Sequence, residues 1–343
     1  MKWIVLIFTL FLIILISVKW KVWFRNPPEP AYLSINEPGR IQLTFGNEGE
    51  FSRNISWQCG NKIRPSSTTI VEEGTTDTMH IKAFAKLFET MGGITVCYHT
   101  ELKNLRKGAS YKYRVNTEKS HSNWYRFKIN DHKDNFSFVY VGDIQDTING
   151  VTKDFFTNIR KRNNSIDFWV LAGDVIERPQ DRYWNEYFRS TDSISQTIPF
   201  IACPGNHEYM KGINRTIEER FIYTFSYFID SSYKGHSVFD LKYGNTAIIT
   251  LDSNKDPWTL GSQKEWFENA LKRAQNSKWK IVVLHHPIYS IRGKMNNLIT
   301  RLTFNSLIKK YGVDLVLEGH EHAYARMITK TESKELTTPV YII

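Results

Sequence analysis

The second half of the chain carries a series of continuous apolar runs, and these constrain its fold more than any other feature. Beyond residue 135 the runs recur between amphipathic segments and read FSFVYV, DFWVLA, PFIAC, AIITL, KIVVL and VDLVL. Runs that are continuous rather than alternating indicate strands covered on both faces, as in parallel sheets flanked by helices. Residues 135–343 are therefore expected to form a layered α/β domain.

Residues 31–130 have a different pattern, because their apolar residues alternate with polar ones. Runs such as RIQLTF, RNISWQC and SYKYRV are separated by turn residues, which is typical of a small antiparallel β-sandwich. Within LRKGASYKYRV, Leu105, Gly108 and Tyr111 have the spacing of the tyrosine corner of immunoglobulin and fibronectin type III sandwiches. The expected fold class is α/β, with a fibronectin-like β-sandwich before the α/β domain.

The amino terminus carries a membrane-targeting segment. Residues 3–18, WIVLIFTLFLIILISV, are almost entirely apolar, and aromatic and lysine residues extend the span to residue 24. No small-x-small site follows, which favours an uncleaved transmembrane anchor over residues 1–24 rather than a cleaved signal peptide. The proline-rich residues 25–30 are expected to be an extended linker that holds the folded part off the membrane.

Localisation follows from that segment. We expect a membrane-anchored protein whose folded part is extracytoplasmic, or a secreted protein if the segment is cleaved. Lys19, Lys21 and Arg25 after the apolar run slightly outnumber Lys2 and the amino terminus before it, which mildly opposes export, so the orientation stays open.

Charge and cysteine content narrow the classes of partner. The formal net charge is +10 over 343 residues, but Lys and Arg form no dense tract, so no nucleic-acid scaffold role is expected. Cys59 and Cys97 lie in the same predicted domain, where a disulfide and two separate buried thiols are both open. Cys203 is expected to be a buried small apolar residue.

Polar residues follow the predicted strands at the points where they end: GD at 142, GD at 173, GNH at 205, HH at 285 and GHEH at 319. The carboxyl ends of strands in open α/β sheets line one crevice. These turns would bring seven side chains to one edge, namely those of Asp143, Asp174, Asn206, His207, His285, His320 and His322. Each residue by itself could instead be a helix cap, a turn residue or a core residue, but a separate explanation of this kind would then be needed at every strand end. Carboxylate and imidazole groups suit zinc, iron and manganese, so a metal site is expected.

Side-chain alternation along extended chain makes two further predictions. His320 and His322 are two positions apart, so both imidazoles should reach the same side of the sheet edge. His285 and His286 are adjacent and should point to opposite faces, so only one of them should bind a metal.

In order and spacing, the motifs GDIQ, GDVIE, GNHE, VVLH and GHEH resemble those of the calcineurin-like metallophosphoesterases, and most closely those of the purple acid phosphatases. The sandwich at 31–130 is similar to the fibronectin-type domain that precedes the catalytic domain in that group. The resemblance implies a metal-dependent phosphatase that hydrolyses phosphate monoesters by attack of a metal-bound hydroxide. A phosphodiesterase or nucleotidase is the near alternative, and a non-catalytic surface binding module with a degenerate metal site is the third.

The resemblance also implies individual roles. Two metal ions, of iron, zinc or manganese, would be bridged by Asp174. Asp143 and His322 would bind the first metal, and the second would be bound by Asn206, His285 and His320. His207 matches the catalytic histidine that protonates the leaving oxygen or stabilises charge. Asn206 and His207 would also contact the substrate.

Several positions depart from the family pattern. Purple acid phosphatases have a tyrosine three residues after the bridging aspartate, where this chain has Glu177, so no purple colour is expected. Glu177 is then a ligand of the first metal or a surface ion-pair residue. Gln145 stands where wider relatives have histidine, and it is a weak ligand or a hydrogen-bond donor to a ligand. Arg292 or Lys294 would contact phosphate or serve only as solvated loop residues.

The closing residues TTPVYII resemble the start of a strand that relatives continue into a glycine-rich turn. The chain is therefore expected to be truncated at its carboxyl end. An edge strand of the sheet would then be missing.

Overall fold

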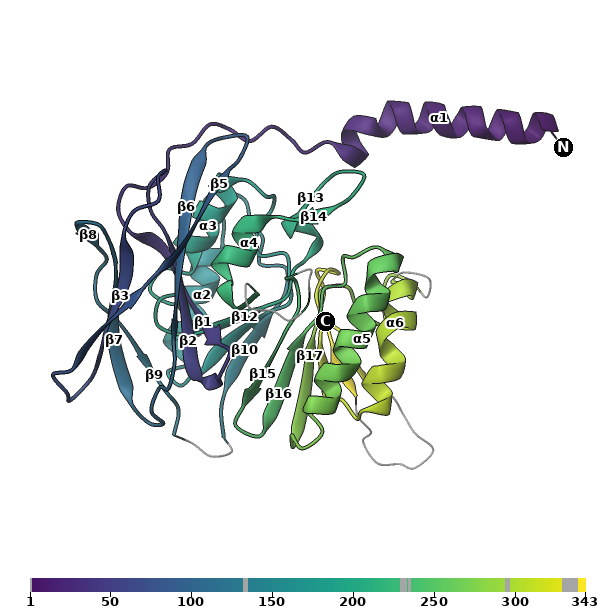
Figure 1. Cartoon of the computed structure of the whole chain (residues 1–343). Coiled ribbons are helices and arrows are strands. Elements are labelled where there is room, and N and C mark those ends of the chain that lie inside the picture. The colour runs from purple at the N-terminus through teal and green to yellow at the C-terminus, as the bar shows by residue number, and fades with distance from the viewer. Residues whose placement is uncertain (1, 132–134, 229–232, 234–235, 294–296, 329–338) are drawn as a thin grey trace.

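The computed structural model describes residues 2–131, 135–228, 233, 236–293, 297–328 and 339–343. A helix, α1 (Lys2–Phe24), projects from the body (Figure 1). A β-sandwich follows, with β1 (Gly39–Gly46), β2 (Gly49–Gln58), β3 (Ser66–Glu72), β4 (Thr78–Lys82), β5 (Phe84–Glu89), β6 (Ile94–Leu102), β7 (Ser110–Thr117), β8 (Ser120–His121) and β9 (Tyr125–Lys128).

The α/β part forms the rest of the molecule. Its first elements are β10 (Phe138–Val141), α2 (Thr152–Arg162), β11 (Phe168–Leu171), α3 (Asp181–Ser190), β12 (Phe200–Ala202), the 3-10 helix η1 (Asn206–Glu208), β13 (Tyr209–Met210), β14 (Thr216–Ile217), α4 (Glu219–Thr224) and the 3-10 helix η2 (Ser226–Phe228). It continues with β15 (Phe239–Tyr243), β16 (Thr246–Thr250), α5 (Pro257–Arg273), β17 (Trp279–Val283), α6 (Leu298–Lys310), β18 (Leu315–Leu317), β19 (Arg326–Ile328) and β20 (Val340–Ile342).

The expected α/β fold class is confirmed, because the continuous apolar runs form parallel strands in two sheets. β10, β11 and β12 pair in parallel, and β16, β17 and β18 do the same in a second, six-stranded sheet. The strand expected at the carboxyl end is present as β20, which lies between β18 and β19 inside the second sheet.

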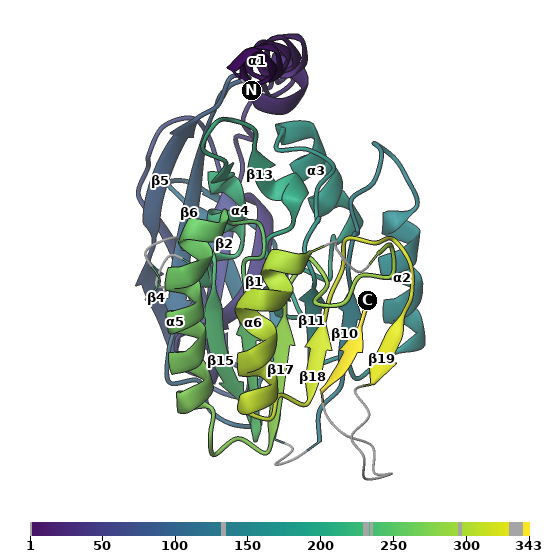
Figure 2. The ribbon, with the colours of Figure 1, turned by 90° about the vertical axis from the view of Figure 1, so that its right-hand side faces the viewer.

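Burial on both faces explains why the apolar runs are continuous. In the second sheet, Ile248 and Ile281 join the core between the two sheets. The next residues along the same strands, Ile249 and Val282, instead pack with Phe267 of α5 in a separate cluster. Figure 2 shows α5 and α6 covering this outer face of the sheet. Each strand therefore needs an apolar residue at every position.

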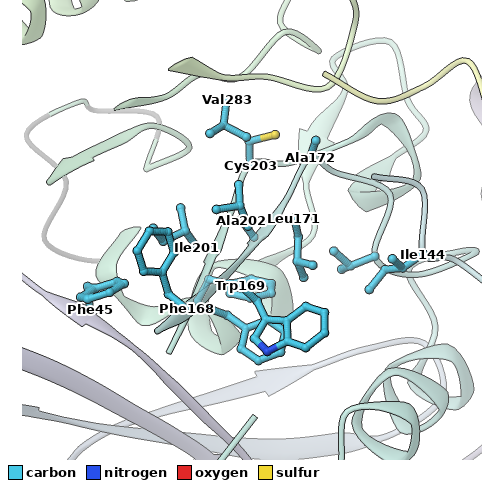
Figure 3. Close-up of a cluster of buried hydrophobic side chains, with 14 of the residues drawn as sticks. Phe45, Ile144, Phe168, Trp169, Leu171, Ala172, Ile201, Ala202, Cys203 and Val283 are labelled. Carbon is cyan, nitrogen blue, oxygen red and sulfur yellow. The ribbon is translucent and has the colours of Figure 1, made fainter. Parts of the chain in front are cut away.

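The sandwich and the α/β part share one sheet, which no sequence pattern indicated. β1 pairs in parallel with β12 at Thr44 and Phe200, giving a seven-stranded sheet in the order β10-β11-β12-β1-β2-β6-β5. The backbone N–H of Leu43 also donates to Ser195 O at 2.7 Å. Phe45 of β1 is fully buried and meets Phe168 edge-on, so the main core extends across both parts (Figure 3).

The sandwich contains the predicted tyrosine corner. The backbone N–H of Arg106 donates to the Tyr111 hydroxyl oxygen at 2.8 Å, and Gly108 has φ +75°, which favours glycine. Of the two alternatives for Cys59 and Cys97, the structure has the separate buried thiols, and Cys203 is buried as expected.

α1 is the one helix, in the part of the chain that the structure describes, with the length and composition of a membrane span. Its most apolar window has a mean hydropathy of 2.5, and none of its residues is buried. A signal sequence has the same properties, so both alternatives for this segment stay open.

The predicted linker, residues 25–30, has no helix or strand, but it is fixed to the body. The side chain of Glu29 is buried, and its carboxylate lies 3.0 Å from Arg220 Nη1 and accepts the backbone N–H of Asp181 at 2.6 Å. Arg220 also pairs with Glu218. Burial opposes the charge of Arg220, but Glu218 and Glu29 outweigh it and raise the pKa of Arg220 above its usual value.

Replacing Arg220 with methionine should destabilise the protein strongly. The side chains of Arg220 and Glu29 are 2% and 4% exposed, so the substitution leaves buried carboxylates without a cation. We expect a loss of about 3–5 kcal/mol in the free energy of unfolding, measured by urea denaturation of the detergent-solubilised chain.

Arg126→Met is the matched control, because Arg126 pairs with Glu73 on the surface and is 75% exposed. This variant should lose no more than about 1 kcal/mol in the free energy of unfolding. Equal losses in the two variants would contradict a fixed, buried attachment of residues 25–30.

Candidate metal centre

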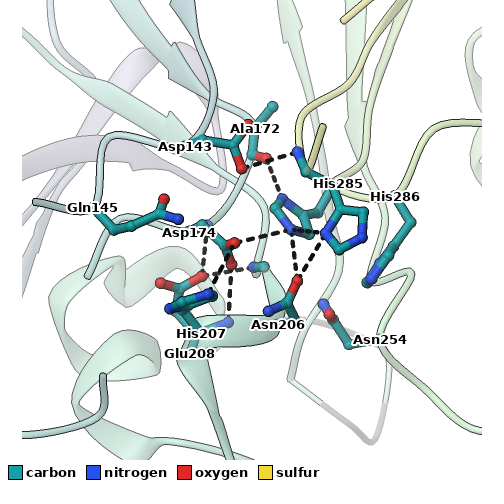
Figure 4. A network of polar contacts seen from close by, with 12 residues as sticks. Asp143, Gln145, Ala172, Asp174, Asn206, His207, Glu208, Asn254, His285 and His286 are labelled. Atoms are coloured by element: carbon teal, nitrogen blue, oxygen red, sulfur yellow. Dashed lines mark hydrogen bonds and ion pairs between the residues drawn. The ribbon is translucent and has the colours of Figure 1, made fainter. Parts of the chain in front are cut away.

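The seven residues predicted from the strand ends lie together at one edge of the two sheets. Figure 4 shows five of them: Asp143, Asp174, Asn206, His207 and His285. Asp143, Asp174 and Asn206 follow β10, β11 and β12 of the first sheet. His285 follows β17, and the GHEH turn follows β18 of the second sheet. The candidate site is therefore the crevice where the carboxyl ends of strands from both sheets meet.

Sharp turns present these side chains. Asp143, Asp174, His320 and His322 have φ of +54°, +51°, +73° and +49°, values that only a few per cent of non-glycine residues adopt. Backbone strain of this kind is concentrated at functional sites and persists only where surrounding contacts enforce it.

Glycines allow those turns to pack against each other. A Cβ on Gly205 would collide with the Asp174 carboxylate. A Cβ on Gly319 would lie 2.7 Å from Ala172 O and 3.1 Å from the Asp143 carboxylate. This close approach explains why glycine precedes the functional residues in GNH and GHEH.

Asp174 lies at the centre of the cluster. Its Oδ2 is 3.2 Å from His285 Nε2, and its Oδ1 accepts the backbone N–H of His207 at 2.9 Å. Burial opposes ionisation of Asp174, but His285 and His207 outweigh it and lower the pKa of Asp174. One ligand atom each from Asp143, Asp174 and His285 lies within 4.8 Å of the others, which is close enough to hold one cation.

His285 is buried and oriented by the backbone. Its Nδ1 lies 2.9 Å from Ala172 O, so an Nδ1–H donor leaves Nε2 directed at Asp174. Burial disfavours the protonated ring, but Asp174 outweighs it and raises the pKa of His285 to about 9.

Asn206 and His320 complete that side of the centre. Asn206 Oδ1 is 3.1 Å from His285 Nε2 and 2.9 Å from His320 Nδ1. Burial and the neighbouring His285 lower the pKa of His320 to about 4. Three donors thus converge on one point beside Asp174.

The other side of the centre is more open. His322 Nε2 is 3.8 Å from Asp143 Oδ1 and 3.3 Å from Gln145 Nε2, and the His322 side chain is 60% exposed. Burial raises the pKa of Asp143. The Oε1 atom of Gln145 is buried and has no hydrogen-bond partner among the residues that the structure describes, which suits either predicted role of Gln145.

His207 lies at the rim, with Glu177 beside it. His207 Nδ1 is 2.6 Å from Glu177 O, and its Nε2 is 3.8 Å from Asp174 Oδ2. The Glu177 carboxylate lies 3.9 Å from both His207 Nδ1 and Arg178 Nε. The structure therefore places Glu177 next to the predicted catalytic histidine, and both predicted roles of Glu177 stay open.

The prediction that His286 points away from His285 is wrong. β17 ends at Val283, so the two histidines lie in a turn where strand alternation no longer applies. The His286 ring lies 4.3 Å from the His320 ring, and its Nδ1 is 2.9 Å from Ser253 Oγ. His285, His286 and His320 form a second group whose ligand atoms lie within 4.8 Å of one another.

The extended geometry expected for GHEH is also wrong, since β18 ends at Leu317 and both histidines have positive φ. His320 instead reaches Asn206, whereas His322 reaches Asp143. Both histidines contact the site, but from different sides.

Glu208 is a site residue that the sequence analysis missed. It is fully buried, and its carboxylate accepts the backbone N–H groups of Gly205, Asp174, Val175 and Ile176. Burial and the neighbouring Asp174 raise the pKa of Glu208, and the backbone N–H groups of Gly205 and Ile176 oppose that rise because they stabilise the carboxylate. Its position in GNHE was the only available signal, and that motif gave no reason to separate it from an ordinary helix residue.

Cationic residues near the rim were also missed, apart from Arg292. Arg215 Nη2 donates to Asn206 O at 3.4 Å, and its guanidinium lies 5.3 Å from the Tyr209 ring centre. Lys255 Nζ lies 5.5 Å from the same ring centre. Arg292 donates to Glu321 O at 3.1 Å. No motif distinguished Arg215 or Lys255, and Lys294 lies outside the described residues.

The donor set fits metal ions. Carboxylate, imidazole and amide groups from separate turns converge within hydrogen-bond distance of one another, an arrangement that costs free energy without a cation. The backbone carbonyl bonded to His285 is the kind of support that ligating histidines usually have.

Comparisons with known proteins agree with this geometry. Residues 136–324 match the family described as Calcineurin-like phosphoesterase, and residues 38–129 match the Purple acid Phosphatase, N-terminal domain. The chain is 23% identical over 325 residues to Fe(3+)-Zn(2+) purple acid phosphatase 12 of Arabidopsis thaliana, covering 88% of this chain and 66% of that one. Acid phosphatase type 7 of Mus musculus is 22% identical over 342 residues, covering 88% and 70%.

A solved structure shows the same fold. Purple acid phosphatase PPD1 from yellow lupin seeds superposes with a TM-score of 0.73 at 17% identity, over 90% of this chain and 64% of that one. The chain thus spans about two thirds of the length of the Arabidopsis and lupin proteins.

Metal binding at this centre should release a proton near neutral pH. With a folded pKa of about 9 against an ordinary value of 6.5, His285 is protonated at about pH 7 in the metal-free protein and must lose that proton to bind a metal. Calorimetric titration of zinc in buffers of different ionisation enthalpy should detect release of about one proton near pH 7 and almost none above about pH 10.

The same raised pKa makes protonated His285 stabilise the metal-free protein. That contribution is fully present below pH 6.5 and is lost as pH rises through about 9. If the calorimetric titration detected the same proton release near about pH 7 and above about pH 10, the raised pKa of His285 would be contradicted.

Glu208→Gln should weaken metal binding without removing any predicted ligand. An amide NH₂ cannot accept the backbone N–H groups that hold the turn at Asp174, so that turn should loosen. We expect a fall in metal affinity of about 10–100-fold, measured by competition with a chelator. The matched control, Glu265→Gln on the exposed side of α5, should bind metal as the wild type does.

Proposed function

Because the chain belongs to the calcineurin-like phosphoesterase family, we propose that it is a dinuclear-metal phosphatase that hydrolyses phosphate monoesters. One observation carries the proposal: the Asp174 carboxylate shares a cluster of ligand atoms, all within 4.8 Å of one another, with Asp143 and His285. His322 adjoins Asp143, and Asn206 adjoins His285, so further donors are available next to both partners of Asp174. A carboxylate in that position can bridge two cations.

In this proposal, Asp143, Asp174 and His322 hold the first metal, with Gln145 or Glu177 as an additional ligand. Asp174, Asn206, His285 and His320 hold the second, and His286 is close enough to join them. Two bound cations of iron, zinc or manganese would neutralise phosphoryl oxygens and lower the pKa of a water molecule, so that it loses a proton and supplies the hydroxide that attacks phosphorus.

His207 is the proposed proton donor to the leaving oxygen. A protonated ring would donate from Nδ1 to Glu177 O, which leaves Nε2–H directed into the site near Asp174. That hydrogen bond would hold the ring in one orientation. Protonation of the leaving group by a positioned histidine typically accelerates such reactions by about 10²–10⁴-fold.

Three cations would surround the substrate phosphate, which carries two negative charges. Arg292 is held by Glu321 O and lies near enough to help lower the pKa of His320. Arg215 is held over the Tyr209 ring and against Asn206 O. Lys255 stands over the same ring, and these fixed charges would favour an anionic ester.

Around this site we propose the following organisation. Residues 31–130 form the fibronectin-like sandwich, and residues 135–343 form the catalytic part. α1 anchors the chain in a membrane with the folded part extracytoplasmic, or is removed from a secreted protein. The exposed apolar surface of α1 supports the anchored form.

Asp174→Asn should abolish metal-dependent hydrolysis, because an amide has one metal-binding oxygen and no charge with which to bridge two cations. We expect turnover of a chromogenic phosphomonoester to fall by at least about 10³-fold, or about 4 kcal/mol in activation free energy. The assay uses added zinc, manganese and iron, with the corresponding diester measured in parallel.

Asp154→Asn, on the exposed surface of α2, is the matched control and should keep wild-type turnover. A higher rate with the diester would favour the phosphodiesterase alternative. Metal-loaded wild-type protein that hydrolyses neither ester would overturn the proposal in favour of the binding module.

A further inference from the structure

The β13–β14 hairpin connects the candidate site directly to the amino-terminal helix. β13 begins at Tyr209, immediately after Glu208, and the hairpin extends toward α1 (Figure 1). Lys211 Nζ donates to Val22 O at 3.0 Å, in the last turn of α1. Lys211 and Asn26 also exchange two backbone-to-side-chain hydrogen bonds, of 2.7 and 2.9 Å.

The chain after α1 is held at a second point. Pro28 O accepts from Gln180 Nε2 at 3.1 Å, and the buried Glu29 carboxylate pairs with Arg220. Residues 22–30, here called the strap, are therefore attached to the hairpin at one end and to α3 and α4 at the other. The strap cannot act as a flexible tether, because its attachments fix where the hairpin lies relative to the end of α1.

Chain geometry limits how far the site lies from α1. Asn206 and Lys211 are five residues apart, and extended chain spans at most about 3.6 Å per residue. Their Cα atoms are therefore no more than about 18 Å apart, while Lys211 itself touches Val22. If α1 spans a bilayer, the site lies close to the membrane surface.

The hairpin tip, residues 211–215, has the composition of a lipid-facing surface. Ile213 is 77% exposed and stands between Lys211 and Arg215. The end of α1 beside it presents exposed Trp20 and Trp23. Aromatic, apolar and basic residues together are characteristic of segments at the lipid–water interface, and the basic ones favour anionic lipids.

We infer that the hairpin tip lies in the lipid–water interface of an anionic membrane beside α1, and that the site acts on phosphate esters displayed at that surface. The substrate class is a phosphorylated lipid headgroup. The tip is hydrogen-bonded to the end of α1 through Lys211, and this contact supports a bilayer as the surface against which the tip lies. The substrate part of the inference rests on the proposed function, whereas the position of the tip does not.

Fluorescence quenching tests the position. Cys59, Cys97 and Cys203 are all buried, so a cysteine introduced at the surface can be labelled selectively. The full chain carrying Ile213→Cys is labelled with an environment-sensitive dye and reconstituted in phosphatidylcholine–phosphatidylserine vesicles that contain spin-labelled lipid. Lys242→Cys, at an exposed position of β15, is the control, because the β15–β16 turn lies at the opposite end of the strands from the site.

The emission of the dye at position 213 should shift to the blue and be quenched by the spin-labelled lipid. The dye at position 242 should show neither change. An absence of lipid quenching at 213 would overturn the inference. So would protection of that label from both lipid and aqueous quenchers, because a protein or a second copy of the chain would then cover the tip. None of these readouts requires turnover, so they remain valid for a chain without phosphatase activity.

A second experiment tests the substrate class. A flexible Gly-Ser insert between Arg25 and Asn26 keeps the anchor but separates it from the hairpin. The insert should lower hydrolysis of a phosphatidylinositol phosphate in vesicles and leave hydrolysis of the soluble chromogenic monoester unchanged. Equal effects on both substrates would overturn the substrate assignment, whereas loss of the soluble activity in the wild type would instead overturn the proposed function.

Discussion

The carboxylate of Glu208 holds the candidate site together. It accepts four backbone N–H groups from two turns, one after β11 and one after β12, and so fixes Asp174 next to Asn206 and His207. A single buried carboxylate can satisfy several turn donors that would otherwise be unpaired. The left-handed backbone at Asp174, the close approach of Gly205 and the position of Asp174 beside His285 all depend on this arrangement. The donors that would hold metals are thus arranged by groups that never touch a metal.

The sequence predicted the fold class and the site because both follow from local patterns. Continuous apolar runs indicated strands covered on both sides, and the polar residues at their ends converge wherever parallel strands share an edge. Details that depend on where a strand stops were not predictable in this way. β17 ends before His285, so strand alternation placed His286 incorrectly. Glu208 and Arg215 were missed because their roles come from bonds to backbone groups, which leave no trace in a residue pattern.

Contacts between residues far apart in the sequence were the second kind of feature that could not be predicted. Residues 25–30 have the composition of a spacer, but a glutamate in a proline-rich segment does not show that an arginine 191 residues later is its partner. Burying such a pair costs desolvation energy that the attraction between the charges only partly repays. Its effect is therefore more on arrangement than on net stability: it allows one placement of this segment against α3 and α4 and penalises others.

The parallel pairing of β1 with β12 changes the role of the sandwich. Without β1, the three short parallel strands β10, β11 and β12 would end in an exposed edge with unpaired backbone groups, which is a common route to aggregation. Residues 39–46 cover that edge, and Phe45 extends the hydrophobic core of the α/β part at the same time. The amino-terminal part therefore protects the edge of the sheet that carries the candidate site. Removing this part would expose the edge of β12 and lower the solubility of the protein, although no residue of the candidate site would be lost.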